Sequence, residues 1–373
     1  MKIIVNALSA RLGGGQTYLK NLLAHLPVQP DLEIVVYAPA SLRLPEDPRI
    51  RRGITRWPTT NPLLRTLWEK FTLPRILLVE RAHILFCPGG VVATRAPDDC
   101  KVVTMFRNMI PFDPEALARI PPGLQKLRNF MLKRVMLRSM TNADLTIFIS
   151  QHARQVIETL TSVRKSVTIP HGINAAFRTH GQIVQRPNWL PESEYLLYVS
   201  RFDVYKHQLE VTKAYAALPP DLRSRYKLLL VGEADNALAR AVSDLAQKSG
   251  LENQIDIVGP IAYAELPAAY HHAAVNIFAS SCENCPNILL EALGAGRPVL
   301  SSAIMPMPEF GGDAAGYFDP TDPTSIRGEM IRVLYDEPLR HELAAAAVRR
   351  SADFDWVKTS RTTWQSIADL VGE

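Results

Sequence analysis

The sequence predicts an α/β protein with two Rossmann-like domains, whose parallel sheets face each other across a cleft. Predicted strands alternate with predicted helices in both halves of the 373-residue chain, which implies parallel strands joined by right-handed crossovers. A polar segment with Pro187 and Pro191 separates the two halves. With 47% hydrophobic residues, the chain can bury two ordinary cores.

The first half begins with a predicted strand over residues 2–6, a loop of three adjacent glycines and a helix through Tyr18. Backbone N–H groups at such a helix start can approach a phosphate or a sugar, which makes Gly14 and Gly15 candidate binding residues. A tight strand-to-helix turn explains the glycines equally well. The other predicted elements are strands over 32–37, 84–86, 101–105, 145–150 and 166–169 and helices over 124–140 and 151–160.

The second half repeats strand and helix. Its predicted strands cover residues 195–199, 227–231, 255–258, 275–279 and 298–301, and its helices cover 209–217, 237–249, 266–273 and 356–371. The predicted organisation is an N-terminal domain over 1–178, a linker over 179–194, a second domain over 195–354 and a C-terminal segment over 355–373.

A basic pair follows the first strand of the second half. Ser200 ends this strand, and Arg201 and Lys206 stand five positions apart in the following loop. A guanidinium and an ammonium at one strand end can hold a diphosphate, the first as a planar fork and the second as a point charge. The ends of the next two strands would border a nucleotide base: Gly232, Glu233 and the segment 258–263, which contains Ile261.

Two glutamates mark the stretch from Val275 to Ser302. Glu283 lies in the loop after one strand, and Glu291 follows eight positions later on the next helix. Open α/β sheets bind ligands at the carboxyl ends of their strands, and ionised carboxylates accept strong hydrogen bonds from paired sugar hydroxyls. The N–H groups of the helix start would face the same site. A buried helix with two solvated acids is an equally weighted alternative.

Residues 283–300, which read ENCPNILLEALGAGRPVL, resemble the E-x7-E signature of retaining GT-B-fold glycosyltransferases of family 4. The basic pair and the PHGIN segment at 170–174 resemble further family motifs, so the resemblance covers almost the whole chain. It implies that Glu283 positions the donor sugar, that Glu291 accepts the ribose hydroxyls, and that the last helix crosses back onto the N-terminal domain. The implied donor-binding residues are Gly14, Gly15, Ser200, Arg201, Lys206, Gly232, Glu233, Ile261, Asn284, Cys285, Pro286, Asn287, Ile288 and Glu291.

Many family members carry His-Asp where this chain has Arg107-Asn108. In those members the histidine touches the donor sugar. An arginine stays cationic and cannot act as a general base, so no catalytic histidine is predicted here. We place Arg107 and Asn108 on the acceptor side, where Arg107 would hold an anionic acceptor or brace the diphosphate. A salt bridge that supports the loop is the alternative.

The formal charge of +5 and the pI of about 9.0 suit an anionic nucleotide, a phospholipid surface or a nucleic acid. We predict that the chain binds a nucleotide-sugar and not a nucleic acid. A general attraction of positive charge to nucleic acid would not explain the two glutamates, Glu283 and Glu291, or the basic pair of Arg201 and Lys206. No apolar run could span a membrane and no signal peptide is visible, which predicts a cytoplasmic protein, with the inner face of the membrane as an option.

Two basic stretches bear on membrane contact. The predicted helix over 124–140 carries five cations, and the segment 61–81 adds a basic and aromatic stretch. A basic amphipathic helix can lie on an anionic membrane. A packed helix with a solvated cationic face is the favoured alternative.

The four cysteines form no dense disulfide framework, which predicts a reduced chain. Cys282 and Cys285 form a C-x-x-C motif, but no second pair or histidine cluster lies nearby at ligand spacing, so packing is favoured over a metal or redox role. The only D-x-D motif, at 353–355, lies far from any strand end. We therefore expect no metal and no cofactor.

The predicted function is the retaining transfer of a sugar from a UDP- or GDP-sugar to a hydroxyl of a glycan or lipid-linked acceptor. Arg201, Lys206 and Glu283 are the predicted catalytic residues, with the two cations neutralising the leaving group. Retention rests on the family resemblance. Two rivals remain open: a sugar-nucleotide epimerase of the same fold, and a non-catalytic basic membrane adaptor.

Overall fold

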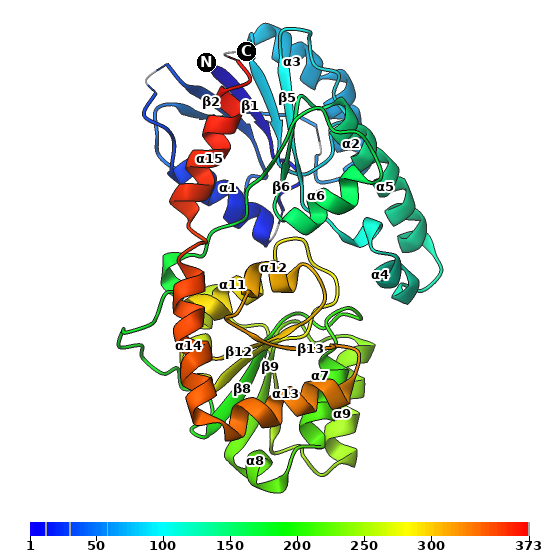
Figure 1. Ribbon diagram of the computed structural model, residues 1–373. Coiled ribbons are helices and arrows are strands. Elements are labelled where there is room, and N and C mark those ends of the chain that lie inside the picture. The colour runs from blue at the N-terminus through cyan, green and yellow to red at the C-terminus, as the bar shows by residue number, and fades with distance from the viewer. Residues whose placement is uncertain (12, 30, 58, 372–373) are drawn as a thin grey trace. The chain divides into compact units, whose positions relative to one another are not determined.

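The computed structural model describes residues 1–371 except 12, 30 and 58. The chain forms two compact units, each with one parallel sheet covered by helices (Figure 1). Unit 1 consists of Met1–Phe112, Pro122–Gly172 and Trp356–Glu373, and unit 2 consists of Asp113–Pro121 and Ile173–Asp355. The two α/β halves predicted from the sequence are confirmed.

The sheet of unit 1 has seven parallel strands in the order β3-β2-β1-β4-β5-β6-β7. The strands are β1 Lys2–Asn6, β2 Glu33–Tyr37, β3 Ile50–Arg52, β4 Ile84–Cys87, β5 Lys101–Phe106, β6 Leu145–Phe148 and β7 Ser166–Thr168. Its central strands are almost continuous apolar runs because helices cover both of their faces. The strand order reverses at β1 and β4, so the loops after these two strands meet at the carboxyl edge.

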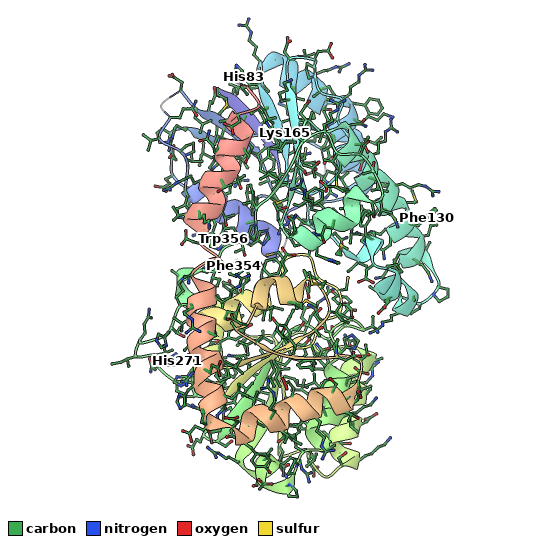
Figure 2. The ribbon with its side chains drawn as sticks, in the orientation of Figure 1. His83, Phe130, Lys165, His271, Phe354 and Trp356 are labelled. Carbon is green, nitrogen blue, oxygen red and sulfur yellow. The ribbon has the colours of Figure 1, made fainter. Side chains whose placement is uncertain are left out.

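The helices of unit 1 include one from the C-terminal end of the chain. They are α1 Gly14–Ala24, α2 Pro62–Phe71, α3 Leu73–Val79, α5 Leu124–Asn142, α6 Gln151–Glu158 and α15 Trp356–Ala368, with the 3-10 helix η1 Ile110–Phe112. The indole Nε1 of Trp364 donates to the carbonyl oxygen of Leu22 at 3.0 Å, which ties α15 to α1. The rings of Tyr18, His171 and Trp356 pack together, and Figure 2 labels Trp356 at the start of α15.

The sheet of unit 2 has six parallel strands in the order β10-β9-β8-β11-β12-β13. The strands are β8 Glu194–Val199, β9 Tyr226–Val231, β10 Ile255–Gly259, β11 Val275–Phe278, β12 Val299–Ser302 and β13 Gly316–Phe318. The sequence did not predict β13, because three residues that begin with glycine give little strand signal.

Unit 2 contains most of the helices. They are α4 Pro114–Arg119, α7 Gln208–Ala216, α8 Pro220–Arg225, α9 Ala237–Lys248, α10 Leu266–His272, α11 Asn287–Gly294, α12 Met307–Gly311, α13 Pro323–Tyr335 and α14 Glu337–Ser351, with the 3-10 helices η2 Ala175–Phe177 and η3 Tyr263–Glu265. The side chains of Asp322 and Asp336 cap α13 and α14, each accepting a backbone N–H at 2.8 Å.

The unit boundaries differ from the predicted domain boundaries. The predicted N-terminal domain covered residues 1–178. The structure assigns two parts of this range to unit 2: the segment Asp113–Pro121, and the residues from Ile173 onward. Hydrogen bonds explain the second difference, since the guanidinium of Arg178 donates to the carbonyl oxygens of Ser351 and Phe354 at 3.1 and 2.7 Å. The predicted linker over 179–194 also lies in unit 2.

Candidate functional site

The candidate site lies where the strand order of unit 2 reverses. Strand β8 lies between β9 and β11, so the loops that leave β8 and β11 meet at the carboxyl edge of the sheet. The backbone N–H of Ser281, in the loop after β11, donates to the carbonyl oxygen of Tyr205, in the loop after β8, at 2.8 Å. The sheet therefore brings the two predicted motifs together although they lie about eighty positions apart.

Lys206 and Glu283 form an ion pair at this edge. The Nζ of Lys206 donates to Oε1 of Glu283, and the hydroxyl of Ser280 donates to the same oxygen at 2.7 Å. Lys206 is only 6% exposed, and its Nζ lies 5.1 Å from the ring centroid of Phe278. The pair is thus held largely out of water, where electrostatic interactions are stronger than in solvent.

Arg201 lies at the same strand end but is more exposed to solvent than Lys206. Its side chain is 57% exposed, and its Nη2 donates to Oδ2 of Asp203 at 2.8 Å and to the hydroxyl of Tyr205 at 3.0 Å. The Nζ of Lys206 lies 5.3 Å from the ring centroid of Tyr205. Both predicted cations therefore border Tyr205, which the structure places between them and which the sequence did not single out.

The ends of β8 and β9 are packed closely at this edge. Gly232 has φ +148°, and a Cβ atom there would lie 2.2 Å from the carbonyl oxygen of Ser200, so only glycine fits. The backbone N–H of Phe202 donates to the carbonyl oxygen of Glu233 at 2.9 Å. Among the described residues, the buried hydroxyl of Ser200 has no hydrogen-bond partner. These contacts place Ser200, Gly232 and Glu233 at the site edge, as predicted, and leave their ligand contacts a prediction.

Helix α11 begins at the site. Asn284, Cys285 and Pro286 are buried just before it, and the half-buried Asn287 and Ile288 form its first turn. The N-terminal N–H groups of a helix favour an anionic or hydroxyl-rich ligand. The structure therefore places the backbone of the predicted donor loop where the sequence expected it.

Glu291 lies on α11 between two tyrosine hydroxyls. Tyr263 donates to Oε1 at 2.9 Å and Tyr270 to Oε2 at 3.5 Å. Burial raises the pKa of Glu291 to about 7, while the two tyrosine hydroxyls act in the opposite direction. Ile261, which is half-buried, precedes the 3-10 helix that carries Tyr263. Glu291 thus already accepts hydroxyl donors of the kind that a ribose would provide.

The C-x-x-C motif belongs to the packing of the same loop. The side chains of Cys282 and Cys285 are both buried. Burial and the neighbouring Asp113 raise the pKa of Cys282, which keeps this thiol protonated at neutral pH. Among the described residues, no three His, Cys, Asp or Glu side chains are grouped to hold a metal ion.

The side chain of His207, next to Lys206, contacts residues from two distant segments of unit 2, one with Arg119 and one with Ser281. His207 adopts the left-handed conformation at φ 52°, and its buried ring contacts the hydroxyl of Ser281 and Nη1 of Arg119 at 2.8 and 2.9 Å from Nε2. The Nδ1 of the same ring lies 3.4 Å from Nη1 of Arg119 and 3.6 Å from Oε2 of Glu210. The sequence gave no signal for this contact, because Arg119 precedes His207 by 88 positions.

We expect His207→Asn to lower the free energy of unfolding by about 1–3 kcal/mol, because the half-buried guanidinium of Arg119 and the hydroxyl of Ser281 lose their contact with the ring. Asparagine tolerates the left-handed conformation, so backbone strain contributes little. Chemical denaturation of His207→Asn, Arg119→Gln and the double variant measures the effect. If the two single losses simply add in the double variant, the Arg119–His207 contact contributes nothing to stability.

The remaining predicted residues lie in unit 1. Gly14 and Gly15 begin α1, and a Cβ atom at Gly15 would lie 3.6 Å from Nη1 of Arg107. The guanidinium of Arg107 also lies 5.5 Å from the ring centroid of Tyr18. The Oδ1 of Asn108 accepts the backbone N–H of Ile110 at 3.2 Å, which stabilises the turn into η1. Arg107 thus joins the glycine loop, whose part in donor binding stays a prediction.

The prediction from the sequence that Arg107 holds an anionic acceptor implies that Arg107→Ala and Arg107→His each raise the acceptor KM about tenfold, because both would weaken this charge-assisted contact. Steady-state kinetics with the native acceptor at saturating donor measures this. An unchanged acceptor KM in both variants would assign Arg107 to loop support alone.

Two families match consecutive parts of the chain. Residues 181–350 match the family described as Glycosyl transferases group 1, and residues 12–177 match Glycosyltransferase Family 4. The serotype-specific mannosyltransferase WbdA of Escherichia coli is 26% identical over 257 residues, which cover 67% of this chain and 31% of that protein. The chain spans between about a third and a half of the length of the curated relatives it matches.

Two solved structures have the same fold over the whole chain. Sucrose-phosphate synthase from Thermosynechococcus elongatus has a TM-score of 0.74 at 18% identity, covering 100% of this chain and 99% of its own. HepE from Anabaena in complex with UDP has a TM-score of 0.74 at 16% identity, covering 99% of this chain and 100% of its own. At these identities the likeness concerns the fold.

Proposed function

Because the chain belongs to the glycosyltransferases of group 1 and family 4, we propose that it transfers a sugar, with retention, from a UDP- or GDP-sugar to a hydroxyl of a glycan or lipid-linked acceptor. The fold is the GT-B fold predicted from the sequence. The buried Lys206–Glu283 pair at the β8–β11 edge is the observation that carries the proposal. The pair supports the proposal because an ammonium group can stabilise a leaving phosphate and a carboxylate beside it can accept sugar hydroxyls.

We propose one orientation of the donor at this edge. The ribose hydroxyls donate to Glu291, in place of the hydroxyls of Tyr263 and Tyr270 that contact it now. The diphosphate lies against Arg201 and Lys206, and the sugar hydroxyls donate to Glu283 and meet the first turn of α11. This order, from base to sugar, rests on the resemblance of residues 283–291 to the E-x7-E signature.

In the proposed reaction the bond between the sugar C1 and the phosphate oxygen breaks, and the acceptor oxygen bonds to C1 on the same face. The acceptor proton passes to the leaving phosphate oxygen, so no protein base is required. Arg201 and Lys206 stabilise the negative charge that develops on the diphosphate. These two cations supply the charge that a divalent ion would otherwise provide, so we propose that transfer needs no metal and no cofactor.

The choice of first donors follows from the relatives. HepE has been solved with UDP and with UDP-glucose, and WbdA is named a mannosyltransferase. We therefore propose to test UDP-glucose and GDP-mannose first. A ligand that binds only the folded state raises its stability, so thermal denaturation with each sugar nucleotide identifies the base and sugar that bind.

Product analysis with labelled sugar nucleotides tests the reaction. Label found on a glycan or lipid-linked acceptor, with the anomeric configuration of the donor, supports the proposal. An epimerised sugar nucleotide would favour the epimerase, and binding without any turnover would favour the non-catalytic adaptor. A product of inverted configuration would overturn retention while leaving transfer in place.

The proposal includes peripheral contact with an anionic membrane, because a lipid-linked acceptor is embedded there. In the described part of the chain, no helix combines the length and the apolar character needed to cross a bilayer.

A further inference from the structure

Helix α5 of unit 1 exposes apolar side chains from its first residue to Val135. Leu124, Leu127, Phe130, Met131 and Val135 are each between 42% and 86% exposed. Spacings of three and four residues place side chains on one face of a helix, so these five cover its outer side. Phe130 lies at the outer edge of unit 1 in Figure 2. Exposed apolar groups that gather in this way mark an interaction site.

The opposite side of α5 is occupied by the fold. Asn129, Met136, Ser139 and Met140 are buried. The hydroxyl of Ser139 accepts the backbone N–H of Val92 at 2.9 Å and donates to the carbonyl oxygen of Val135 at 2.8 Å. The helix is therefore anchored by its inner face, and the apolar outer face is not needed for the core of unit 1.

The outer face is also strongly basic. Helix α5 contains five cations and no acidic residue. Four of the five are exposed, namely Lys126, Arg128, Arg134 and Arg138. The guanidinium of Arg134 lies 3.9 Å from the ring centroid of Phe130, so the exposed aromatic ring and a cation form one contact. The cations and the apolar side chains share the face instead of occupying opposite sides.

Helix α2 also exposes apolar side chains and a cation. On α2, Leu63, Leu67 and Phe71 are exposed at four-residue intervals, and Lys70 lies 5.4 Å from the ring of Phe71. The segment 92–94 links the two helices, because Val92 bonds to Ser139 of α5 and the hydroxyl of Thr94 donates to the carbonyl oxygen of Glu69 of α2 at 2.7 Å. Both helices therefore pack on one short segment.

We propose that the outer faces of α5 and α2 dock on an anionic lipid bilayer, with α5 lying in the plane of the interface. A helix of 19 residues extends about 28 Å, which gives a long contact for apolar side chains at the headgroup boundary and cations among the lipid phosphates. A second copy of this chain would bring the same unbalanced cations onto the face, so charge argues against self-association.

The structure agrees with the packed helix and exposed cations that the sequence favoured for α5, and adds exposed apolar side chains. Leu124, Leu127 and Met131 face outward with the cations, which the sequence pattern alone did not indicate. The docking surface deepens the peripheral membrane contact proposed above and rests on that part of the proposed function. It does not depend on the transfer reaction, since none of these residues belongs to the β8–β11 edge of unit 2.

Co-sedimentation of the full chain with lipid vesicles tests the docking. We expect the wild type to bind phosphatidylcholine vesicles that contain phosphatidylglycerol at least about tenfold more tightly than pure phosphatidylcholine, and to lose affinity as salt rises. Arg134→Gln with Arg138→Gln should weaken binding about thirtyfold. Leu127→Ser with Met131→Ser should weaken it about tenfold or more, because fewer apolar groups enter the interface.

Matched controls change the same residue types elsewhere. Lys213→Gln with Lys248→Gln removes two exposed cations of unit 2, and Val28→Ser with Ile183→Ser removes two exposed apolar side chains outside α5 and α2. Both control pairs should bind vesicles like the wild type. Thermal denaturation with the sugar nucleotide checks that every variant is folded and still binds its donor.

Three results would overturn the docking surface. The first is equal binding to anionic and neutral vesicles, or none to either. The second is wild-type binding by both α5 variants. The third is self-association of the wild type without lipid, measured by analytical ultracentrifugation and lost in the α5 variants, which would assign the face to a second copy. Because donor binding is measured separately, failure of the docking is distinguishable from failure of the proposed function.

Discussion

Lys206→Ala is expected to lower kcat about 100- to 1000-fold, the usual loss when one electrostatic stabiliser of a transition state is removed. The ammonium of Lys206 is buried beside Glu283 and faces the position proposed for the leaving diphosphate. A buried charge acts in a low-dielectric site, so solvent replaces it poorly. Single-turnover kinetics with the labelled donor measures the chemical step directly.

Stability must be measured together with turnover, because Lys206→Ala leaves Glu283 partly buried without its cation. Breaking such a pair typically costs about 3–5 kcal/mol, less where solvent reaches the remaining charge. The double variant Lys206→Ala with Glu283→Gln removes both charges, and it should recover stability without recovering turnover. Lys213→Ala, an exposed cation on α7, should behave like the wild type. Recovery of kcat in the double variant would show that Lys206 serves only to neutralise Glu283.

Arg201 is expected to contribute less than Lys206. Its guanidinium is 57% exposed and already pairs with Asp203. Water screens exposed charges, so its removal should reduce kcat by a smaller factor than the removal of Lys206. Equal losses in the two variants would mean that the guanidinium moves fully into the site when the donor binds.

The strands and loops that carry this site could be predicted from the sequence, because each is a local pattern. The apolar runs of β8 and β11, the helix after Pro286 and the positions of Lys206 and Glu283 all follow from short segments. The direct contact between Lys206 and Glu283 could not be predicted in the same way. It depends on β8 and β11 being neighbours, and the order of strands in a sheet is set by packing of the whole domain.

The contacts that the sequence missed are similarly non-local. Tyr263 and Tyr270 reach Glu291 from η3 and α10, and no spacing rule connects them to α11. His207 has a positive φ without being glycine, and Arg119 comes from the first half of the chain. For α5, periodicity showed a helix but not which face is buried, since apolar residues occur on both.

Binding of the sugar nucleotide is expected to weaken about tenfold between pH 8 and pH 6, because Glu291 must be ionised to accept two ribose hydroxyls. The pKa of Glu291 is raised to about 7, mainly by burial. At pH 6 only about a tenth of the protein then carries the carboxylate, and binding must release a proton. Isothermal titration in two buffers of different ionisation enthalpy measures both the affinity and the released proton. A sugar nucleotide is the right ligand, since its diphosphate does not titrate in this range.

Glu291→Gln should weaken binding about tenfold or more at pH 8 and abolish the pH dependence, while Glu265→Gln, a change at an exposed glutamate of η3, should leave both unchanged. The same carboxyl affects the stability of the free protein. Its folded-state pKa lies above the unfolded value of 4.5, so the folded state binds more protons between pH 4.5 and about 7. The wild type should therefore lose stability relative to Glu291→Gln as pH rises through this window, by at most about 3 kcal/mol. Affinity that is constant from pH 6 to pH 8 in the wild type, with no proton released, would remove Glu291 from the ribose site.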